Sequence, residues 1–367
     1  MPFLIKIRIG DAMKNKMKSM LAVSALTMAM ASGAQAQIGG KNVVLIHGFQ
    51  PDTLGDNLTN QQVKSNGYNY WSDYWLPRAE ARIDWDSNER VESGIAQFAY
   101  QQVVDLARSG TCNDGCVFVT HSTGDLVARY ILDNQEAWLA PLGLQPLKVL
   151  TVFDFAGAGG GTEIAEAAYD LANNDSFLTW PIRAAVGAFM GLDVEPENLG
   201  VVNDLRPSKA RNLATAPMAL PRLRFVGSGD DYLSATKLFI AGTDDGVVPL
   251  HSACGATNDE GIDSCVSFIA MDGERKSVDG PDGLWYAHYP VLMGDKTSHS
   301  DTINNETGVK LTYVYNGFRV NGVTVDFDTY VDKYSPWWYF GGADYYQYVR
   351  NSENKSMSRN VYDTVNY

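Results

Sequence analysis

Cysteine, histidine and basic residues are scarce in this chain, and each shortage excludes a class of protein. Its 367 residues include four cysteines and five histidines. No Cys or His cluster accompanies the cysteines, which argues against a zinc or dithiol redox centre. Basic residues number 29 against 43 acidic residues, a net charge of −14. An acidic excess of this size disfavours nucleic acid and anionic membranes as partners.

Long apolar runs and low-complexity tracts are also missing. Beyond residue 36, no stretch reaches the ~18 continuous apolar residues of a membrane-spanning helix. Residues 14–36 instead have the pattern of a secretory signal peptide, so we predict a secreted protein, extracellular or periplasmic. Residues 1–36 hold five basic residues and one acidic residue, and their removal before Gln37 changes the net charge from −14 to −18. The signal consists of Lys14, Lys16 and Lys18, the apolar run 20–31 and the cleavage site Ala34-Gln35-Ala36.

The four cysteines of an exported chain are expected to form disulfides. Cys112 and Cys116 flank a tight turn, and Cys254 and Cys265 flank a loop. Four cysteines allow three connectivities. We predict pairing in sequence order, because each pair already lies in one loop.

The most informative stretch is Thr120-His121-Ser122-Thr123-Gly124. It follows the apolar run 117–119, typical of a buried strand, and precedes a helical pattern at 125–132. A strand that turns sharply into a helix holds its central residue at strained backbone angles and needs small neighbours. The stretch therefore matches the G-x-S-x-G nucleophile elbow, with Ser122 as nucleophile and Thr120 in place of the first glycine.

Three further segments contain groups that such a serine needs. Residues 41–49 predict a buried strand that ends in His47-Gly48-Phe49, an oxyanion-loop pattern. The main-chain N–H groups of Phe49 and Thr123 are the expected oxyanion donors. Residues 237–249 predict a strand that leads into the acidic loop Asp244-Asp245-Gly246, and Ser298-His299-Ser300 follows later. Serine, aspartate and histidine thus occur in the chain order of α/β-hydrolases.

With these motifs in this order, residues 42–309 resemble the α/β-hydrolase superfamily, and within it the bacterial family I secreted triacylglycerol lipases. The resemblance implies a mostly parallel central sheet with helices on both faces. It also implies Ser122 as nucleophile, Asp245 as orienting carboxylate and His299 as base. Asp244 and His288 stay open as alternatives to the last two. Other stretches that resemble these lipases are 149–162 before the lid, 203–208 after it and 222–229 before the acid loop.

The same family has a calcium site beside its histidine. The resemblance implies Asp301, Asn305 and the Val309 carbonyl as ligands, with Asp231 or its neighbour Asp230 as the fourth. Oxygen donors of this mix suit Ca²⁺, although Asp and Asn also form loops without binding metal. No cofactor is implied for catalysis itself.

We predict one catalytic domain, residues 37–310, because the length and the 45% hydrophobic content allow one large core. An insertion at about 160–202 has helical apolar spacing and resembles the lipase lid; a mobile lid and a fixed cap both stay open. Residues 311–367 form an extension of short predicted strands. Its aromatic residues at 337–340 and 345–346 are expected to pack against the core, with a polymer-binding surface as the alternative.

The predicted function is a secreted carboxylic ester hydrolase, a lipase or esterase, that acts through an acyl-enzyme. A polyester or polyhydroxyalkanoate depolymerase on the same fold is an alternative, as is an inactive secreted binding protein. An ester or lipid substrate is the expected partner, while contact with a lipid interface and a dedicated foldase stay open. His47 is expected to fix the oxyanion loop, and His121 to lie in the pocket floor or the core.

Overall fold

The computed structural model describes most of the chain from Gln37 onward. The predicted signal peptide, parts of the predicted lid and Asp231 lie outside the described residues. The described residues are 37–173, 180–190, 196, 199–213, 220–230, 236–238, 240–276, 278–338 and 341–366.

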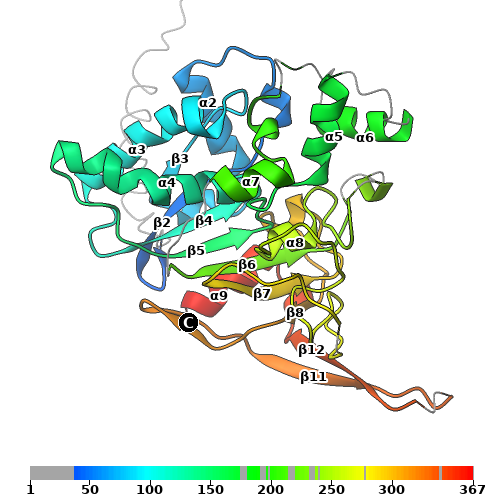
Figure 1. The fold of residues 1–367 in the computed structure, drawn as a ribbon. Helices are drawn as coiled ribbons and strands as arrows, with labels where there is room; N and C mark the ends of the chain where they lie inside the picture. Colours follow the sequence, from blue (N-terminus) through cyan, green and yellow to red (C-terminus); the bar gives the residue numbers. More distant parts are fainter. Residues whose placement is uncertain are drawn as a thin grey trace, which may run out of the picture. The chain divides into compact units, whose positions relative to one another are not determined.

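Ten of the described strands form one sheet (Figure 1). In spatial order these are β1 (Gln37–Ile38), β2 (Lys41–Ile46), β4 (Cys116–His121), β5 (Val149–Phe155), β6 (Arg222–Gly227), β7 (His288–Gly294), β8 (Leu311–Tyr313), β12 (Asp344–Val349) and β11 (Thr329–Tyr334), with β3 (Ala81–Ile83) also paired to β2. All pairings from β3 and β2 to β7 are parallel. Strands β1, β8, β12 and β11 pair antiparallel. The predicted class, a mixed α/β fold with a mostly parallel central sheet, is confirmed.

Apolar side chains cover both faces of the sheet, which explains why its central strands are continuous apolar runs. Val44 and Ile46 of β2 join a core cluster with the helices on one face, and Val43 and Leu45 join a second cluster on the other face. The helices are α2 (Asn60–Tyr70), α3 (Ala96–Ser109), α4 (Gly124–Leu139), α5 (Glu163–Ala172), α6 (Trp180–Met190), α7 (Pro207–Leu213), α8 (Leu250–Ala253) and α9 (Met357–Asn366).

The strand predicted within 237–249 is wrong. The described residues there form a short 3-10 turn at Thr236–Leu238, and a loop with one bridge between Asp244 and Pro249. The reason is the pairing of the neighbouring strands: β6 pairs directly with β7, so no sheet edge is left between them for another strand. The acidic segment is therefore held by loop contacts.

The C-terminal extension continues the central sheet through β8, β12 and β11, and its β9 (Phe318–Val320) and β10 (Val323–Val325) form a separate hairpin. Its aromatic residues do not all pack against the core as predicted. Trp337 is 87% exposed and Trp338 is 62% exposed. Both follow β11, the last strand of the sheet, whose hairpin with β12 extends away from the parallel strands (Figure 1). Tyr345, of the second predicted group, is 43% exposed, and residues 339–340 lie outside the described residues.

The four cysteines pair in sequence order. Cys112 bonds to Cys116, with their Cα atoms 4.8 Å apart, and Cys254 bonds to Cys265, with their Cα atoms 5.7 Å apart. The first disulfide joins Cys112 to the first residue of the nucleophile strand β4, and the second follows the acidic loop. Among the described residues, no helix is both long enough and apolar enough to cross a membrane.

Candidate active site

Ser122 lies in the sharp turn between β4 and α4 with a φ of +56°. This left-handed backbone conformation is uncommon outside glycine. Main-chain hydrogen bonds hold it: the Ser122 N–H donates to the Phe155 carbonyl (3.1 Å), and the Ser122 carbonyl accepts from the Ala158 N–H (2.9 Å). Gly124 allows close packing, because a Cβ there would lie 2.2 Å from the Ile46 carbonyl oxygen. The turn has the geometry predicted for a nucleophile elbow.

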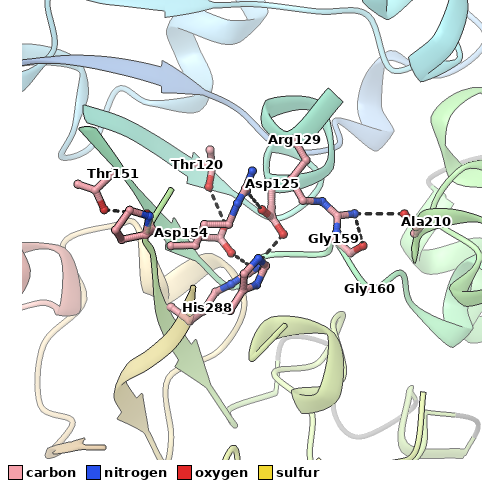
Figure 2. A network of polar contacts seen from close by, with 12 residues as sticks. Thr120, Asp125, Arg129, Thr151, Asp154, Gly159, Gly160, Ala210 and His288 are labelled. Carbon is pink, nitrogen blue, oxygen red and sulfur yellow. Dashed lines mark hydrogen bonds and ion pairs between the residues drawn. The ribbon is translucent and has the colours of Figure 1, made fainter. Parts of the chain in front are cut away.

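Thr120 occupies the position where the elbow pattern has its first glycine, and its side chain takes part in a buried polar network (Figure 2). Its hydroxyl donates to Asp154 Oδ1 (2.6 Å). The Arg224 guanidinium bridges Asp154 and Asp125 Oδ2, the latter at 2.8 Å. Arg222 donates to the other oxygen of Asp125 (2.6 Å). Thr120, two residues before the nucleophile, therefore makes a side-chain hydrogen bond to Asp154 that a glycine could not make.

The charges of this network are buried, and they shift one another's pKa. Burial opposes ionisation of Asp125, but Arg224 and Arg222 outweigh it and lower its pKa to about 2. Burial, and next the charge of Asp125, raise the pKa of Asp154. His288 accepts from Arg224 at Nδ1 (2.7 Å) and is held neutral, because burial and then Arg224 lower its pKa well below the usual value. His288 therefore belongs to this network, and it does not line the cavity at Ser122.

His299 and Asp245 form a buried pair at the predicted acid and base positions. His299 Nδ1 lies 2.8 Å from Asp245 Oδ2. The other carboxylate oxygen accepts from the N–H groups of Val247 (3.0 Å) and Val248 (2.7 Å). The main-chain N–H of His299 also donates to the main-chain carbonyl of Asp245 (2.9 Å). Side chain and main chain thus fix the imidazole with its Nδ1 on the carboxylate, the orientation that leaves Nε2 for proton transfer.

Asp244, the alternative acid, has a different environment. Its Oδ1 accepts from the Gly246 N–H (2.8 Å), and within the described residues its buried Oδ2 has no hydrogen-bond partner. Burial raises its pKa to about 6. Asp245, and not Asp244, contacts the imidazole of His299.

Ser122 and His299 line one cavity of about 300 Å³. Ser122 is only 5% exposed. Phe189 of α6, in the predicted lid, also lines it, and its ring packs on Phe49 with centroids 5.2 Å apart. Apolar groups dominate the lining, which includes Phe49, Trp71, Ala158, Phe189, Leu205, Val247, Val248 and Ile303.

The predicted oxyanion loop lies directly against the serine. A Cβ on Gly48 would lie 2.7 Å from Ser122 Cβ and 2.4 Å from the Tyr70 hydroxyl, so only glycine fits there. Within the described residues, no hydrogen bond uses the main-chain N–H of Phe49 or Thr123. Both of these residues line the cavity.

His47 fixes the start of this loop, as expected from its position. Its Nε2 accepts from the Trp85 N–H (3.1 Å), and its carbonyl accepts from the Trp85 indole (3.0 Å). The two rings stack with centroids 4.8 Å apart. Nδ1 lies 2.8 Å from the Gly48 carbonyl, so the ring donates to the loop itself.

Calcium ligation stays a prediction. Asp301, the first predicted ligand, accepts hydrogen bonds on both carboxylate oxygens, from Ser298 (2.7 Å) and Asn304 (2.9 Å). Among the described residues, no cluster of three His, Cys, Asp or Glu side chains could hold a metal. The Asn305 amide donates to the Asp73 carbonyl (2.7 Å). An ion at this place would have to replace the partners of Asp301.

Sequence reasoning missed Tyr70, Asp154 and Arg224. Tyr70 ends α2, and its hydroxyl bonds to His121 Nδ1 beside the nucleophile. No local pattern marks it, because its contact spans 51 residues and the chain has 19 tyrosines. For Asp154 the available signal was an acidic residue within an apolar strand, which demands a buried partner.

Comparison with known proteins finds distant likenesses only. No protein-family model matches the chain, and no curated protein matches it. Among similar solved structures, a lipase of Bacillus licheniformis in mature form is 13% identical, with a TM-score of 0.39 over 60% of this chain and 81% of that one. A Staphylococcus hyicus lipase is 15% identical, with 0.34 over 72% and 88%. A metagenomic carboxyl esterase is 16% identical, with 0.36 over 58% and 59%. These likenesses are too distant to assign the chemistry, which is inferred from the geometry of the site.

Proposed function

We propose that this protein is a secreted serine hydrolase of carboxylic esters, a lipase or esterase. One observation supports the proposal most: Ser122, held in a left-handed turn, shares an apolar cavity with an imidazole whose Nδ1 is bound to a buried carboxylate. A merely structural serine has no need of a strained turn, a glycine pressed against it and an oriented histidine.

In the proposed mechanism, His299 takes the proton of Ser122 as the hydroxyl oxygen attacks the ester carbonyl carbon. Asp245 keeps the imidazole in the required tautomer and stabilises its charged form. The N–H groups of Phe49 and Thr123 stabilise the oxyanion. His299 then protonates the leaving alcohol. It next takes a proton from the water that attacks the acyl-enzyme and returns that proton to Ser122 as the acid is released.

The cavity lining supports an ester with an apolar acyl group. Phe49 and Phe189 close one wall, and Phe189 belongs to the proposed lid. Because Phe189 packs on Phe49 in the cavity wall, movement of this segment would widen the cavity, and we propose that the lid opens at an apolar surface. The predicted signal peptide and the two disulfides support export from the cytoplasm.

Adjacent aspartates offer a matched pair of variants to test this assignment. Asp245→Asn should lower kcat for p-nitrophenyl esters by about 10⁴-fold, because the imidazole loses its orienting charge. Asp244→Asn is isosteric, keeps the acceptor for Gly246, and should leave kcat within about twofold. Ser122→Ala should abolish turnover while circular dichroism stays that of the wild type. Equal losses in both aspartate variants, or turnover by Ser122→Ala, would refute the mechanism.

A polymer-ester hydrolase is the second candidate, and the exposure of Trp337 and Trp338 favours it. Flat exposed aromatic rings suit binding to an apolar solid. Rates on soluble short esters, emulsified triglyceride and a polyester film discriminate the candidates. If Trp337→Ala with Trp338→Ala slows only the film reaction, the polymer reading gains; unchanged film rates remove it.

We keep calcium as a structural proposal without a role in any catalytic step. The mix of oxygen donors around Asp301 suits a hard cation. Thermal unfolding with and without EDTA checks it: a lower Tm in EDTA that added Ca²⁺ restores supports binding, and an unchanged Tm rejects it.

A further inference from the structure

His121 precedes the nucleophile Ser122 and is buried between the main chain of His299 and the end of α2. Its Nε2 lies 3.1 Å from the main-chain carbonyl oxygen of His299. Its Nδ1 contacts the hydroxyl of Tyr70. The centroids of the His121 and His299 imidazole rings lie 4.6 Å apart. The His121 side chain, in the nucleophile elbow, therefore contacts both the end of α2 and the loop that carries His299, here called the base loop.

The chemistry of the partners defines the tautomer of His121. A carbonyl oxygen only accepts hydrogen bonds, so Nε2 must carry the proton and donate to His299. Nδ1 is then an acceptor, and the Tyr70 hydroxyl donates to it. Burial, and next the proximity of His299, lower the pKa of His121 well below its usual value, so the ring stays neutral and the direction of both bonds is constant.

Tyr70 extends this chain of contacts to the oxyanion loop by packing against Gly48. Burial raises the pKa of its hydroxyl. The absent side chain of Gly48 leaves the space that the hydroxyl fills. The Tyr70 hydroxyl thus packs against Gly48 and bonds to His121, and His121 bonds to the His299 carbonyl.

We propose that Tyr70 and His121 are positioning residues that set the oxyanion loop, the elbow and the base loop at their working separation. The proposal rests on the proposed function. Asp245 orients the imidazole of His299, whereas His121 holds the main chain from which that imidazole extends. Tyr70 holds Gly48, the residue before the donor Phe49. Neither side chain exchanges a proton with the substrate; each acts through the group that it holds.

Substitutions at His121 can separate its two contacts. In His121→Gln the amide nitrogen falls near the place of Nε2 and can still donate to the His299 carbonyl, whereas the shorter Asn cannot reach it. We expect His121→Asn to lower kcat by about 10- to 100-fold with little change in KM, because misplacement by about 1 Å costs rates of this order. His121→Gln should recover most of this loss. A simple structural role predicts no such difference between the two amides.

Tyr70→Phe, with Tyr74→Phe as its control, tests the other end. Tyr74 is buried and Tyr70 is partly buried, and Tyr74 does not line the cavity. We expect Tyr70→Phe to lower kcat by about tenfold and Tyr74→Phe to leave it unchanged, with similar Tm values. This pair keeps the proposal testable even if His121→Asn fails to fold.

The rate of Ser122 labelling by a fluorophosphonate separates two kinds of failure. If the wild type is not labelled at Ser122, the proposed function fails. If the wild type is labelled and His121→Asn and Tyr70→Phe react at the wild-type rate, only the positioning role is overturned. Slower labelling of both, with recovery in His121→Gln, supports it.

Discussion

Two polar networks hold the nucleophile turn, and they differ in kind. Beneath it, Arg224 and Arg222 bind the carboxylates of Asp125 and Asp154 in a fully buried charged cluster (Figure 2). Beside it, the side chains of Tyr70 and His121 join the main chain of two loops without any net charge. The first connects strands and a helix of the core, whereas the second connects loops around the cavity.

The difference predicts a division of work. A buried charge that loses its partner destabilises a protein by about 3–5 kcal/mol, whereas a lost neutral hydrogen bond costs about 0.5–1.5 kcal/mol. Damage to the charged cluster should therefore appear as loss of fold, and damage to the neutral chain as loss of rate. The variants below are ordered by the size of the expected effect.

Arg224→Met should have the largest effect. It leaves Asp125 with one guanidinium fewer and Asp154 without its ionic partner. We expect the free energy of unfolding in urea to fall by about 3–5 kcal/mol, enough to unfold a marginally stable domain. Tyr70→Phe, in contrast, should lose about 1 kcal/mol. A larger loss in Tyr70→Phe than in Arg224→Met would end the distinction between the networks.

Thr120→Gly restores the usual glycine of the elbow pattern, and its effect is predicted to be adverse. Asp154 would lose the hydroxyl donor, and strand β4 would gain backbone freedom in the unfolded chain. We expect the free energy of unfolding to fall by about 1–3 kcal/mol. Thr120→Ser keeps the hydroxyl and should recover part of that loss. If Thr120→Gly is as stable as the wild type by urea unfolding, the hydroxyl does not anchor the turn.

Each network contains one neutral buried histidine, and this predicts a shared pH dependence. Burial lowers the folded-state pKa of both His121 and His288, so the unfolded chain takes up their protons first as the pH falls below about 6.5. Stability present above that pH is then lost, at about 1.4 kcal/mol per pH unit for each histidine.

Asp244 and Asp154 act in the opposite direction between their folded and unfolded pKa values, because the folded pKa is raised to about 6 for Asp244 and to about 7 for Asp154. This contribution is common to the wild type and the variants, so it cancels when their pH dependences are subtracted. His121→Gln and His288→Gln should each reduce the slope of the unfolding free energy against pH by the equivalent of one proton. Urea unfolding from pH 7 to pH 5 measures the slopes. An unchanged slope in either variant would mean that its histidine is protonated in the folded protein.

What the sequence could predict depended on the distance along the chain between interacting residues. The elbow, the oxyanion loop and the acidic loop with Asp245 are short segments, and each can be recognised from its own residues. The hydrogen bonds of the two networks join residues that are 34 to 178 positions apart, so no local pattern reveals them. The exposure of Trp337 was missed for a different reason: large aromatic residues are usually buried, but Trp337 follows β11, the last strand of the sheet.

The most direct test of the account is fluorophosphonate labelling of the wild type, followed by peptide mass spectrometry, because it reports an activated serine without knowledge of the natural substrate. The account predicts one adduct per chain, on Ser122, and labelling that slows strongly in Asp245→Asn but not in Asp244→Asn. An unlabelled folded protein, or an adduct on another serine, would contradict it.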